Sequence, residues 1–291
     1  MNTTVAAVVV TATTVEWLVA DKLTEPICRG EHSFIFGKEN TISVLGHCNK
    51  DLMEYQPSTV RIVVADSALS LAEVSSQFDS SLQKEVEAGD KKIINERLYG
   101  SLKTATDLIG PTLLLDIKRF STNFIYGVDD QHVCSWSADL SGAELTSQYI
   151  QSDPPSPEEL SAALSIVELH VTDVLRELPE LASAIDSLTV FGIGAVPLIS
   201  AVEQGVEIEQ LLPQPTLENT EAEELFRALA TESHEDRANN PGLPPAEVRD
   251  IVGSMCVLVE TMRQLSIGQL NVVAISAADV MVEQLLRKAR D

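Results

Sequence analysis

The chain has 291 residues, more than one hydrophobic core usually serves, so two domains are expected. Its 44 Asp and Glu residues against 20 Lys and Arg give a net charge of −24, which disfavours a nucleic-acid partner and, less strongly, a long polyanionic substrate. The four cysteines are scattered without a CxxC pair, and no signal peptide or membrane-length apolar run is expected, so a cytoplasmic protein with no membrane partner is predicted.

The first part of the chain predicts three strands followed by alternating helices and strands. β-Branched runs predict a hairpin of strands at residues 5–10 and 15–20, with a third strand at 26–29. The elements expected next are a helix at 40–55, a strand at 60–65, a long helix from a cap at Ser67 to about Ala88, a short strand at 92–94 and a helix at 96–108. This is a βββαβαβα order.

The same order restarts after Gly110-Pro111. The strands and helices expected here are strands at 113–117, 123–126 and 133–138, a helix near 143–150, a helix with Ser156 as N-cap, Pro157 first and Glu159 third, a strand at 188–191, helices near 218–230 and 245–266, a strand at 271–275 and a last helix from about Ala277. The repeat predicts two α/β domains, 1–111 and 112–291, with the last helix able to pack back on the first domain.

One stretch carries the chemistry. An apolar run stops at a lone carboxylate, Asp116, and a turn of Lys118, Arg119 and Phe120 leads to the hydroxyls that follow it. A buried strand that ends in Asp, followed by a tight turn and hydroxyl residues, is typical of a loop that holds a metal and phosphate oxygens. Such a turn needs glycines for close approach of the backbone to phosphate, and this one has none.

The chain resembles the exopolyphosphatase/guanosine pentaphosphate phosphohydrolase (Ppx/GppA) family, part of the actin, Hsp70 and sugar-kinase superfamily. The segments that carry the resemblance are Leu18-Val19-Ala20-Asp21, residues 63–69, the Asp153-Pro-Pro-Ser-Pro-Glu-Glu-Leu run, and residues 235–253, which are similar to the family's NPGLPP region. The resemblance implies an α/β fold of two ribonuclease H-like (actin-like ATPase) domains, each a mixed five-stranded sheet with flanking helices.

The family's chemical motifs are only partly present. Its first loop, D-x-G-S/T-N-S, falls on residues 9–14, where Val9 replaces the metal-facing Asp and Thr11 the glycine. Its second loop, D-I-G-G-G-S-T-E, falls on residues 116–123, which lack all three glycines and end in Asn123 instead of Glu. The S-G-x-E-E-A-R segment, source of the proposed general base, falls near residues 94–97, where Glu96 is the candidate and a one-residue shift would give Asn95 or Arg97.

The resemblance therefore implies a set of candidate site residues: Glu96 and Asp116 as catalytic groups, Asp116 as metal ligand, and Ser121, Thr122, Gly192 and Gly194 as phosphate-binding positions. Lys118 and Arg119 are further phosphate-binding candidates, because they place positive charge where the family's glycine amides would point. The cations would hold an anion as side-chain donors, and the glycines would present backbone amides. The alternatives are ordinary solvated turn residues for the two cations and close packing for the two glycines.

Three functions follow. The first hypothesis is a protein that has lost hydrolysis and acts as a binding or regulatory module for polyphosphate or a guanosine phosphate. A valine cannot bind a metal, and losing one preorganised donor costs roughly 100- to 1,000-fold in rate. The second is an active phosphatase that uses Mg²⁺ at Asp116, with Glu96 and the Lys118-Arg119 pair; no other cofactor is expected. The third is a partner subunit of an active relative. The resemblance also implies a homodimer.

Overall fold

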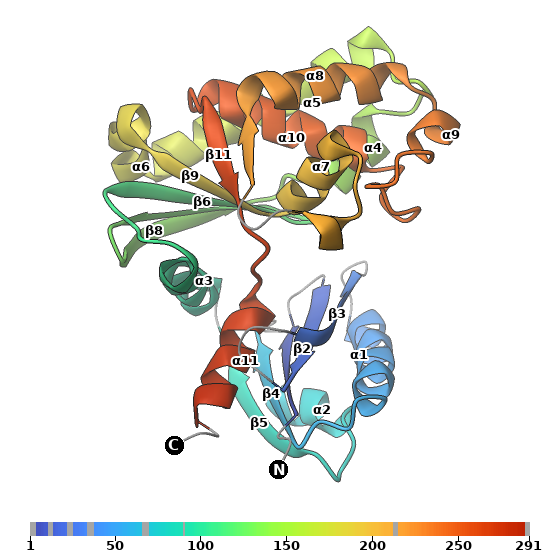
Figure 1. Cartoon of the computed structure of the whole chain (residues 1–291), viewed down its shortest axis with the longest axis vertical. Helices are drawn as coiled ribbons and strands as arrows, with labels where there is room; N and C mark the ends of the chain where they lie inside the picture. The colour runs from blue at the N-terminus through green and yellow to red at the C-terminus, as the bar shows by residue number, and fades with distance from the viewer. Residues whose placement is uncertain are drawn as a thin grey trace. The chain divides into compact units, whose positions relative to one another are not determined.

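The structure is a computed structural model that describes residues 4–10, 14–21, 26–33, 38–65, 70–89, 91–211 and 215–288. Contacts divide the chain into two compact units, residues 1–101 together with 275–291, and residues 102–274. Each unit is built on one mixed sheet with helices packed against it (Figure 1). Across the described ranges, no helix combines the length and the apolar character needed to cross a bilayer.

The first unit contains a five-stranded sheet of order β3-β2-β1-β4-β5. β1, β2 and β3 are antiparallel neighbours, whereas β4 and β5 run parallel to β1. Its elements are β1 (Val5–Val10), β2 (Thr14–Ala20), β3 (Pro26–Ser33), α1 (Lys38–Met53), β4 (Thr59–Val64), α2 (Leu71–Ser76), β5 (Gln83–Ala88), α3 (Lys91–Ala105) and α11 (Ala277–Lys288). α3 continues past residue 101 into the second unit.

β1 is buried at every position because helices cover both faces of this sheet. Ala6, Val8 and Val10 belong to one core with Leu45 and Leu52 of α1. Side chains alternate across a strand, so the intervening β1 residues face the other side, where α11 contacts β1 and β2. Figure 1 shows α1 and α11 on opposite faces of the sheet. This double coverage explains why β1 reads as a continuous apolar run.

The second unit contains a six-stranded sheet of order β10-β11-β9-β6-β7-β8. β6, β7 and β8 are antiparallel neighbours, β9 and β11 run parallel to β6, and β10 is antiparallel to β11. Its elements are β6 (Pro111–Ile117), β7 (Thr122–Val128), β8 (Gln131–Ala138), α4 (Gly142–Tyr149), α5 (Pro157–Glu177), α6 (Pro179–Ala184), β9 (Thr189–Gly194), α7 (Ala195–Gln204), β10 (Thr216–Glu218), α8 (Asn219–Thr231), α9 (His234–Arg237), α10 (Ile251–Gln264) and β11 (Gln269–Val272).

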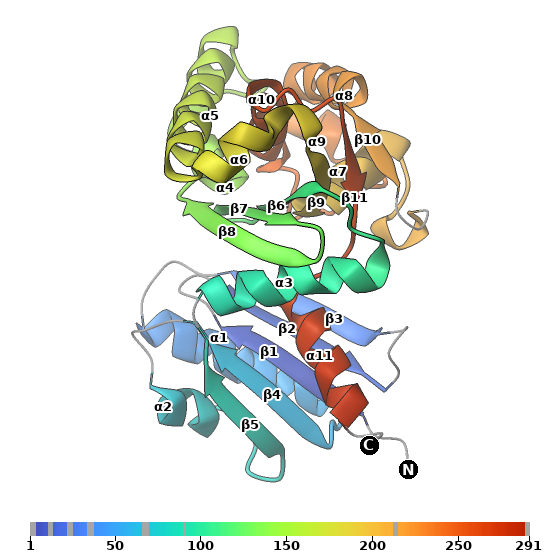
Figure 2. The same cartoon turned by 90° about the vertical axis from the view of Figure 1, so that its left-hand side faces the viewer.

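Apart from β10, the second sheet repeats the strand order of the first. The expected pair of ribonuclease H-like domains is therefore confirmed. In the second unit α10 is the central helix, because it contacts α4, α5 and α8 (Figure 2). It is buried on almost all sides, which explains its near-continuous apolar sequence.

The predicted start of α5 is also confirmed. The Ser156 hydroxyl accepts a hydrogen bond from the backbone N–H of Glu159, and the Glu159 carboxylate accepts one from the backbone N–H of Ser156. Pro157 occupies the first turn, where its missing N–H leaves no helical hydrogen bond unmade.

Several expectations for the sheets and helices are wrong. The second sheet has six strands, not five, because β10 adds an edge strand of three residues, too short to leave an alternating pattern. The long helix expected up to Ala88 is a six-residue helix, α2, capped by Ser70; the Ser67 cap lies outside the described residues. Residues 83–88 form β5, since pairing with buried β4 overrides the helical preference of its Lys and Glu residues.

The strand expected at 92–94 is instead the first turn of α3. Ile93 and Ile94 suggested a strand because they are β-branched neighbours. Ile94 is buried, as are Leu98 and Leu102, and this spacing of four residues is helical. The helix expected from residue 245 begins later, at Ile251.

Candidate functional site

The centre of the candidate site is the turn between β6 and β7. β6 lies between β7 and β9, so its last residues are buried by both neighbours. The backbone N–H of Lys118 donates to the carbonyl oxygen of Ser121 at 2.8 Å, which closes the turn, and Thr122 begins β7. The expected strand–Asp–turn–strand arrangement is present in a turn without glycine.

Asp116 is buried, with 1% of its surface exposed. Its Oδ2 accepts a hydrogen bond from Nδ2 of Asn123, directly opposite on β7, at 3.0 Å. The Nζ of Lys118 lies 3.6 Å from the same oxygen. A buried carboxylate needs such partners, because its unpaired burial would cost several kcal/mol. Lys118, which replaces a glycine of the family motif, and Asn123, which replaces its glutamate, thus both contact the retained aspartate.

Arg119 is held by a different set of acids. Its guanidinium lies 3.6 Å from Oε1 of Glu247 and 3.4 Å from Oδ2 of Asp250, in the segment that leads into α10. It also lies over the ring of Phe120, 6.0 Å from the centroid. Its charge is therefore balanced by two carboxylates, and sequence reasoning missed both because they lie far along the chain.

The hydroxyl of Thr122 makes a hydrogen bond that stabilises the fold. It is buried and donates to the carbonyl oxygen of Leu140 at 2.7 Å, which ties the start of β7 to the residue just before α4. Ser121 is half-buried, and its carbonyl oxygen closes the turn. Both residues thus have a role in holding the turn.

The two glycines of β9 are required by close packing. A Cβ on Gly194 would lie 2.2 Å from the carbonyl oxygen of Ile117 and 3.0 Å from Oδ1 of Asp116, and its φ is +71°. A Cβ on Gly192 would lie 2.6 Å from Cγ1 of Val196, in the first turn of α7. Gly194 therefore places the backbone of β9 directly beside Asp116.

Glu96 belongs to the first unit, whereas the residues around Asp116 belong to the second. It lies on α3, is exposed, and its Oε1 is 3.9 Å from Nζ of Lys92. Asn95, its neighbour, is buried. Gly89 was expected to end a long helix, but it follows β5 directly: a Cβ there would lie 2.4 Å from Cγ1 of Val63, so the strand-to-helix turn needs glycine.

The donor set around Asp116 does not suit a divalent cation. Mg²⁺ favours several oxygen ligands, and here the carboxylate already has an ammonium and an amide N–H as neighbours. Over the ranges that the structure describes, no three His, Cys, Asp or Glu side chains gather as a metal site. Val9, at the position of the family's metal-facing Asp, is buried among apolar residues, and Thr11 of the same loop lies outside the described residues.

The fold and this site place the chain among α/β proteins with two ribonuclease H-like, actin-like domains. The model of the Ppx/GppA phosphatase family matches residues 37–287. The chain therefore belongs to the Ppx/GppA phosphatase family.

Known relatives agree with this family. Exopolyphosphatase 2 of Mycobacterium tuberculosis is 27% identical over 155 residues, a match that covers 52% of this chain and 47% of that protein. The chain thus spans about half the length of this curated relative. The crystal structure of a Ppx/GppA family member from Aquifex aeolicus has a TM-score of 0.70 at 15% identity, with 99% of each chain covered. The structure of an exopolyphosphatase from Cytophaga hutchinsonii has a TM-score of 0.73 at 13% identity, with 98% of each chain covered. At such identities these structures show the fold alone.

Proposed function

We propose that this chain has lost phosphoanhydride hydrolysis and uses the family's scaffold as a binding or regulatory module. The observation that carries the proposal is the contact of Lys118 and Asn123 with Asp116. In the family pattern, the corresponding positions are a glycine and a glutamate. Here they supply a fixed cation and a neutral amide beside the retained carboxylate.

The electrostatics support this proposal. At an effective dielectric constant of about 20, two unit charges about 4 Å apart interact by roughly 4 kcal/mol. The ammonium of Lys118 therefore offsets much of the attraction that Asp116 alone would offer to a dication, and it repels that dication in turn. An amide in place of the closing glutamate cannot accept a proton from water with useful driving force.

The strand-to-helix turn after β5 gives a second line of support. β5 ends at Ala88, Gly89 follows, and α3 begins at Lys91. If the family's S-G-x-E-E-A-R segment is matched by this turn, the S-G pair falls on Ala88-Gly89 and the two glutamates fall on Lys91 and Lys92. Glu96 would then lie a turn later on α3, outside the motif. This match leaves no carboxylate at the position of the proposed base.

The ligand that we propose is polyphosphate or a guanosine phosphate. The ammonium of Lys118 would offset part of the ligand's negative charge without a metal, and the name of the mycobacterial relative, an exopolyphosphatase, points to polyphosphate. A cytoplasmic location, which rests on the scattered cysteines, and a homodimer, which rests on the family alone, are further proposals.

The test is an assay of orthophosphate release from polyphosphate and guanosine pentaphosphate with Mg²⁺, on this chain and its Asp116→Ala variant. We expect equal background release from both. In parallel, the ligand that binds should raise the melting temperature by mass action, with or without Mg²⁺. Release that requires Mg²⁺ and disappears in the variant would overturn the proposal, whatever the melting data show.

A further inference from the structure

The second unit contains a cavity of about 400 Å³ whose lining includes none of the residues that contact Asp116. Its walls come from the C-terminal half of α4, the loop at 151–155, α9 and the segment that enters α10. Sites for small ligands range from roughly 300 to 1,000 Å³, so the cavity is large enough for a small molecule or part of a larger one. Two of the segments that carry the family resemblance, the run that begins at Asp153 and residues 235–253, contribute to its lining.

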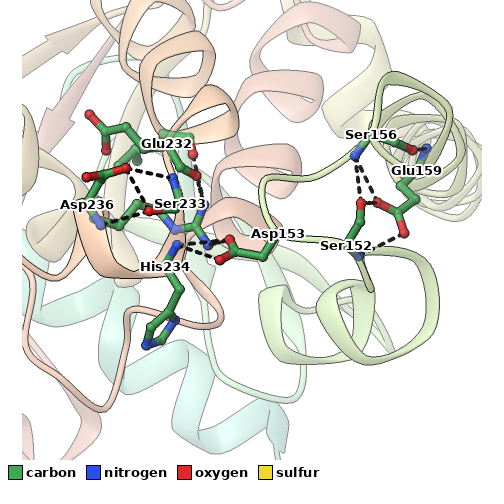
Figure 3. Close-up of polar contacts among 10 residues, drawn as sticks. Ser152, Asp153, Ser156, Glu159, Glu232, Ser233, His234 and Asp236 are labelled. Atoms are coloured by element: carbon green, nitrogen blue, oxygen red, sulfur yellow. Dashed lines mark hydrogen bonds and ion pairs between the residues drawn. The ribbon is translucent and has the colours of Figure 1, made fainter.

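One wall is fixed by the carboxylate of Asp153. Both of its oxygens accept the backbone N–H of His234, at 2.9 and 2.8 Å, and its Oδ1 accepts Nη2 of Arg237 at 2.9 Å. Figure 3 shows Asp153 reaching from its loop to α9. The amide of His234, with the help of Arg237, holds the pKa of the Asp153 carboxyl below its ordinary value. The carboxylate is thus ionised and already paired.

The loop that carries Asp153 is fixed from its other side by Glu159. The Oε1 of Glu159 accepts the backbone N–H groups of Gln151 and Ser152, each at 3.0 Å. Its Oε2 accepts the backbone N–H of Ser156 at 2.9 Å and also the hydroxyl of Ser152 (Figure 3). The walls are therefore preorganised, and a ligand would not have to order them.

The lining carries an excess of positive charge although the chain is strongly acidic. Two guanidinium groups, of Arg237 and Arg249, line the cavity, and within the described lining Asp153 is the only carboxylate. Arg237 is paired with it. Arg249 is exposed and forms no ion pair with any residue of the described ranges. One cation at the cavity is thus left for a ligand.

We propose that this cavity binds a small oxyanion, the phosphate or carboxylate group of a small molecule, with Arg249 as its principal cation. Guanidinium groups bind such anions through charge-assisted hydrogen bonds. The site is separate from the Asp116 site, so an anion bound here would not compete directly with a ligand of that site.

The test uses the full chain, labelled with ¹⁵N, titrated with sodium phosphate and separately with sodium acetate at constant ionic strength, so that general screening is unchanged. We expect saturable shifts of the backbone amides of Gln151 and His234. Arg249→Ala should weaken binding at least about tenfold. Arg176→Ala, which removes the same charge from an exposed pair on α5, should leave binding unchanged.

The two titrations distinguish the sources of the oxyanion. Tighter binding of phosphate identifies a phosphoryl ligand, and tighter binding of acetate a carboxylate; both support the proposal. Absence of saturable shifts with either anion would overturn it. Binding that is equal in the wild type and in a folded Arg249→Ala variant would also overturn it, because the cation would then have no part in recognition. Neither result bears on phosphate release at Asp116.

Discussion

Asp116 is a carboxylate that folding removes from water, so its partners decide what its burial costs. Asn123 supplies a hydrogen bond and Lys118 a nearby charge, and the Lys118 side chain keeps 22% of its surface exposed. Removing one partner of a buried pair is costly because the other charge is left uncompensated. The Lys118–Asp116 contact should therefore affect the free energy of unfolding as well as metal binding.

Lys118→Ala should lower the free energy of unfolding of the second unit by about 1–3 kcal/mol at neutral pH, since a buried carboxylate loses its counter-charge. Urea denaturation followed by circular dichroism measures the change. Adding Asp116→Asn should restore part of the loss, because the uncompensated charge is then removed. Lys92→Ala, at an exposed pair, should cost less than about 1 kcal/mol. Equal effects of Lys118→Ala and Lys92→Ala would contradict the pairing.

Gly194→Ala tests the close approach of β9 to the Asp116 site. The new Cβ would meet the carbonyl oxygen of Ile117 at 2.2 Å, and the positive φ adds strain, so a loss of roughly 2–5 kcal/mol is expected. Gly205→Ala is the matched control, because Gly205 also has a positive φ, +65°, but nothing within 4 Å of its Cβ position. It should cost about 1 kcal/mol. Equal melting temperatures for the two variants would show that the contact is unimportant.

Sequence reasoning identified the residues of this site better than their contacts. Asp116 was found because a single carboxylate at the end of an apolar strand is a local signal. The partners of Arg119 were not found, because Glu247 and Asp250 are brought to it only by the packing of the second unit. The missing glycines suggested an altered loop, but only coordinates show that Lys118 lies beside Asp116.

At the scale of elements, Glu159 links the N-cap of α5 to the loop that precedes the helix. Glu159 accepts hydrogen bonds from the Ser152 hydroxyl and from the backbone N–H groups of Ser156, Gln151 and Ser152, and these lower its pKa to about 2. Its folded-state pKa is thus below the ordinary value of 4.5. The stabilisation is fully present above the ordinary value and is lost as the pH falls toward 2.

Glu159→Gln should lower the melting temperature at pH 7, and the difference from the wild type should shrink as the pH falls from about 5 toward 2. Calorimetry over that range provides the measurement. Glu158→Gln is the control: this neighbour in the same turn makes no hydrogen bond within the described residues, so its effect should be small. A difference that stays constant with pH would show that the Glu159 charge is not what stabilises the loop.

Elements were predictable where local pattern and packing agree. β1 is apolar throughout, β6 carries the apolar run Leu113–Leu115 before Asp116, and the α5 cap has a defined sequence signature. β5 was missed because Gln83-Lys84-Glu85 is polar and favours a helix, and only its pairing with β4 makes it a strand. β10 was missed because three residues carry no periodicity.

At the scale of the whole molecule, the first unit is discontinuous in sequence. It consists of residues 1–101 and of 275–291, so its fold is complete only when residues 275–291 have joined the first segment. α11 buries apolar side chains such as Met281 and Leu285. Its first turn is anchored by Glu16, which accepts the backbone N–H of Ala278 at 3.2 Å, and by Arg29, whose Nη2 lies 3.2 Å from Asp279. The possible return of the last helix to the first domain was part of the domain prediction, but its particular anchors could not be predicted from the sequence.

Deletion of residues 277–291 should therefore unfold the first unit and leave the second unit folded. The face of the sheet that holds Val5, Ala7 and Val9 would lose its cover, and exposed apolar surface of that kind destabilises a sheet and promotes aggregation. Hydrogen exchange measured by mass spectrometry should show lost protection in β1, β2 and β4, with protection retained in β6 and β7. The full chain carrying Arg29→Ala removes only one anchor and should keep protection in both units. Retained protection of β1 after the deletion would show that the five-stranded sheet is stable without α11, and loss of protection in β6 as well would show that the two units do not unfold independently.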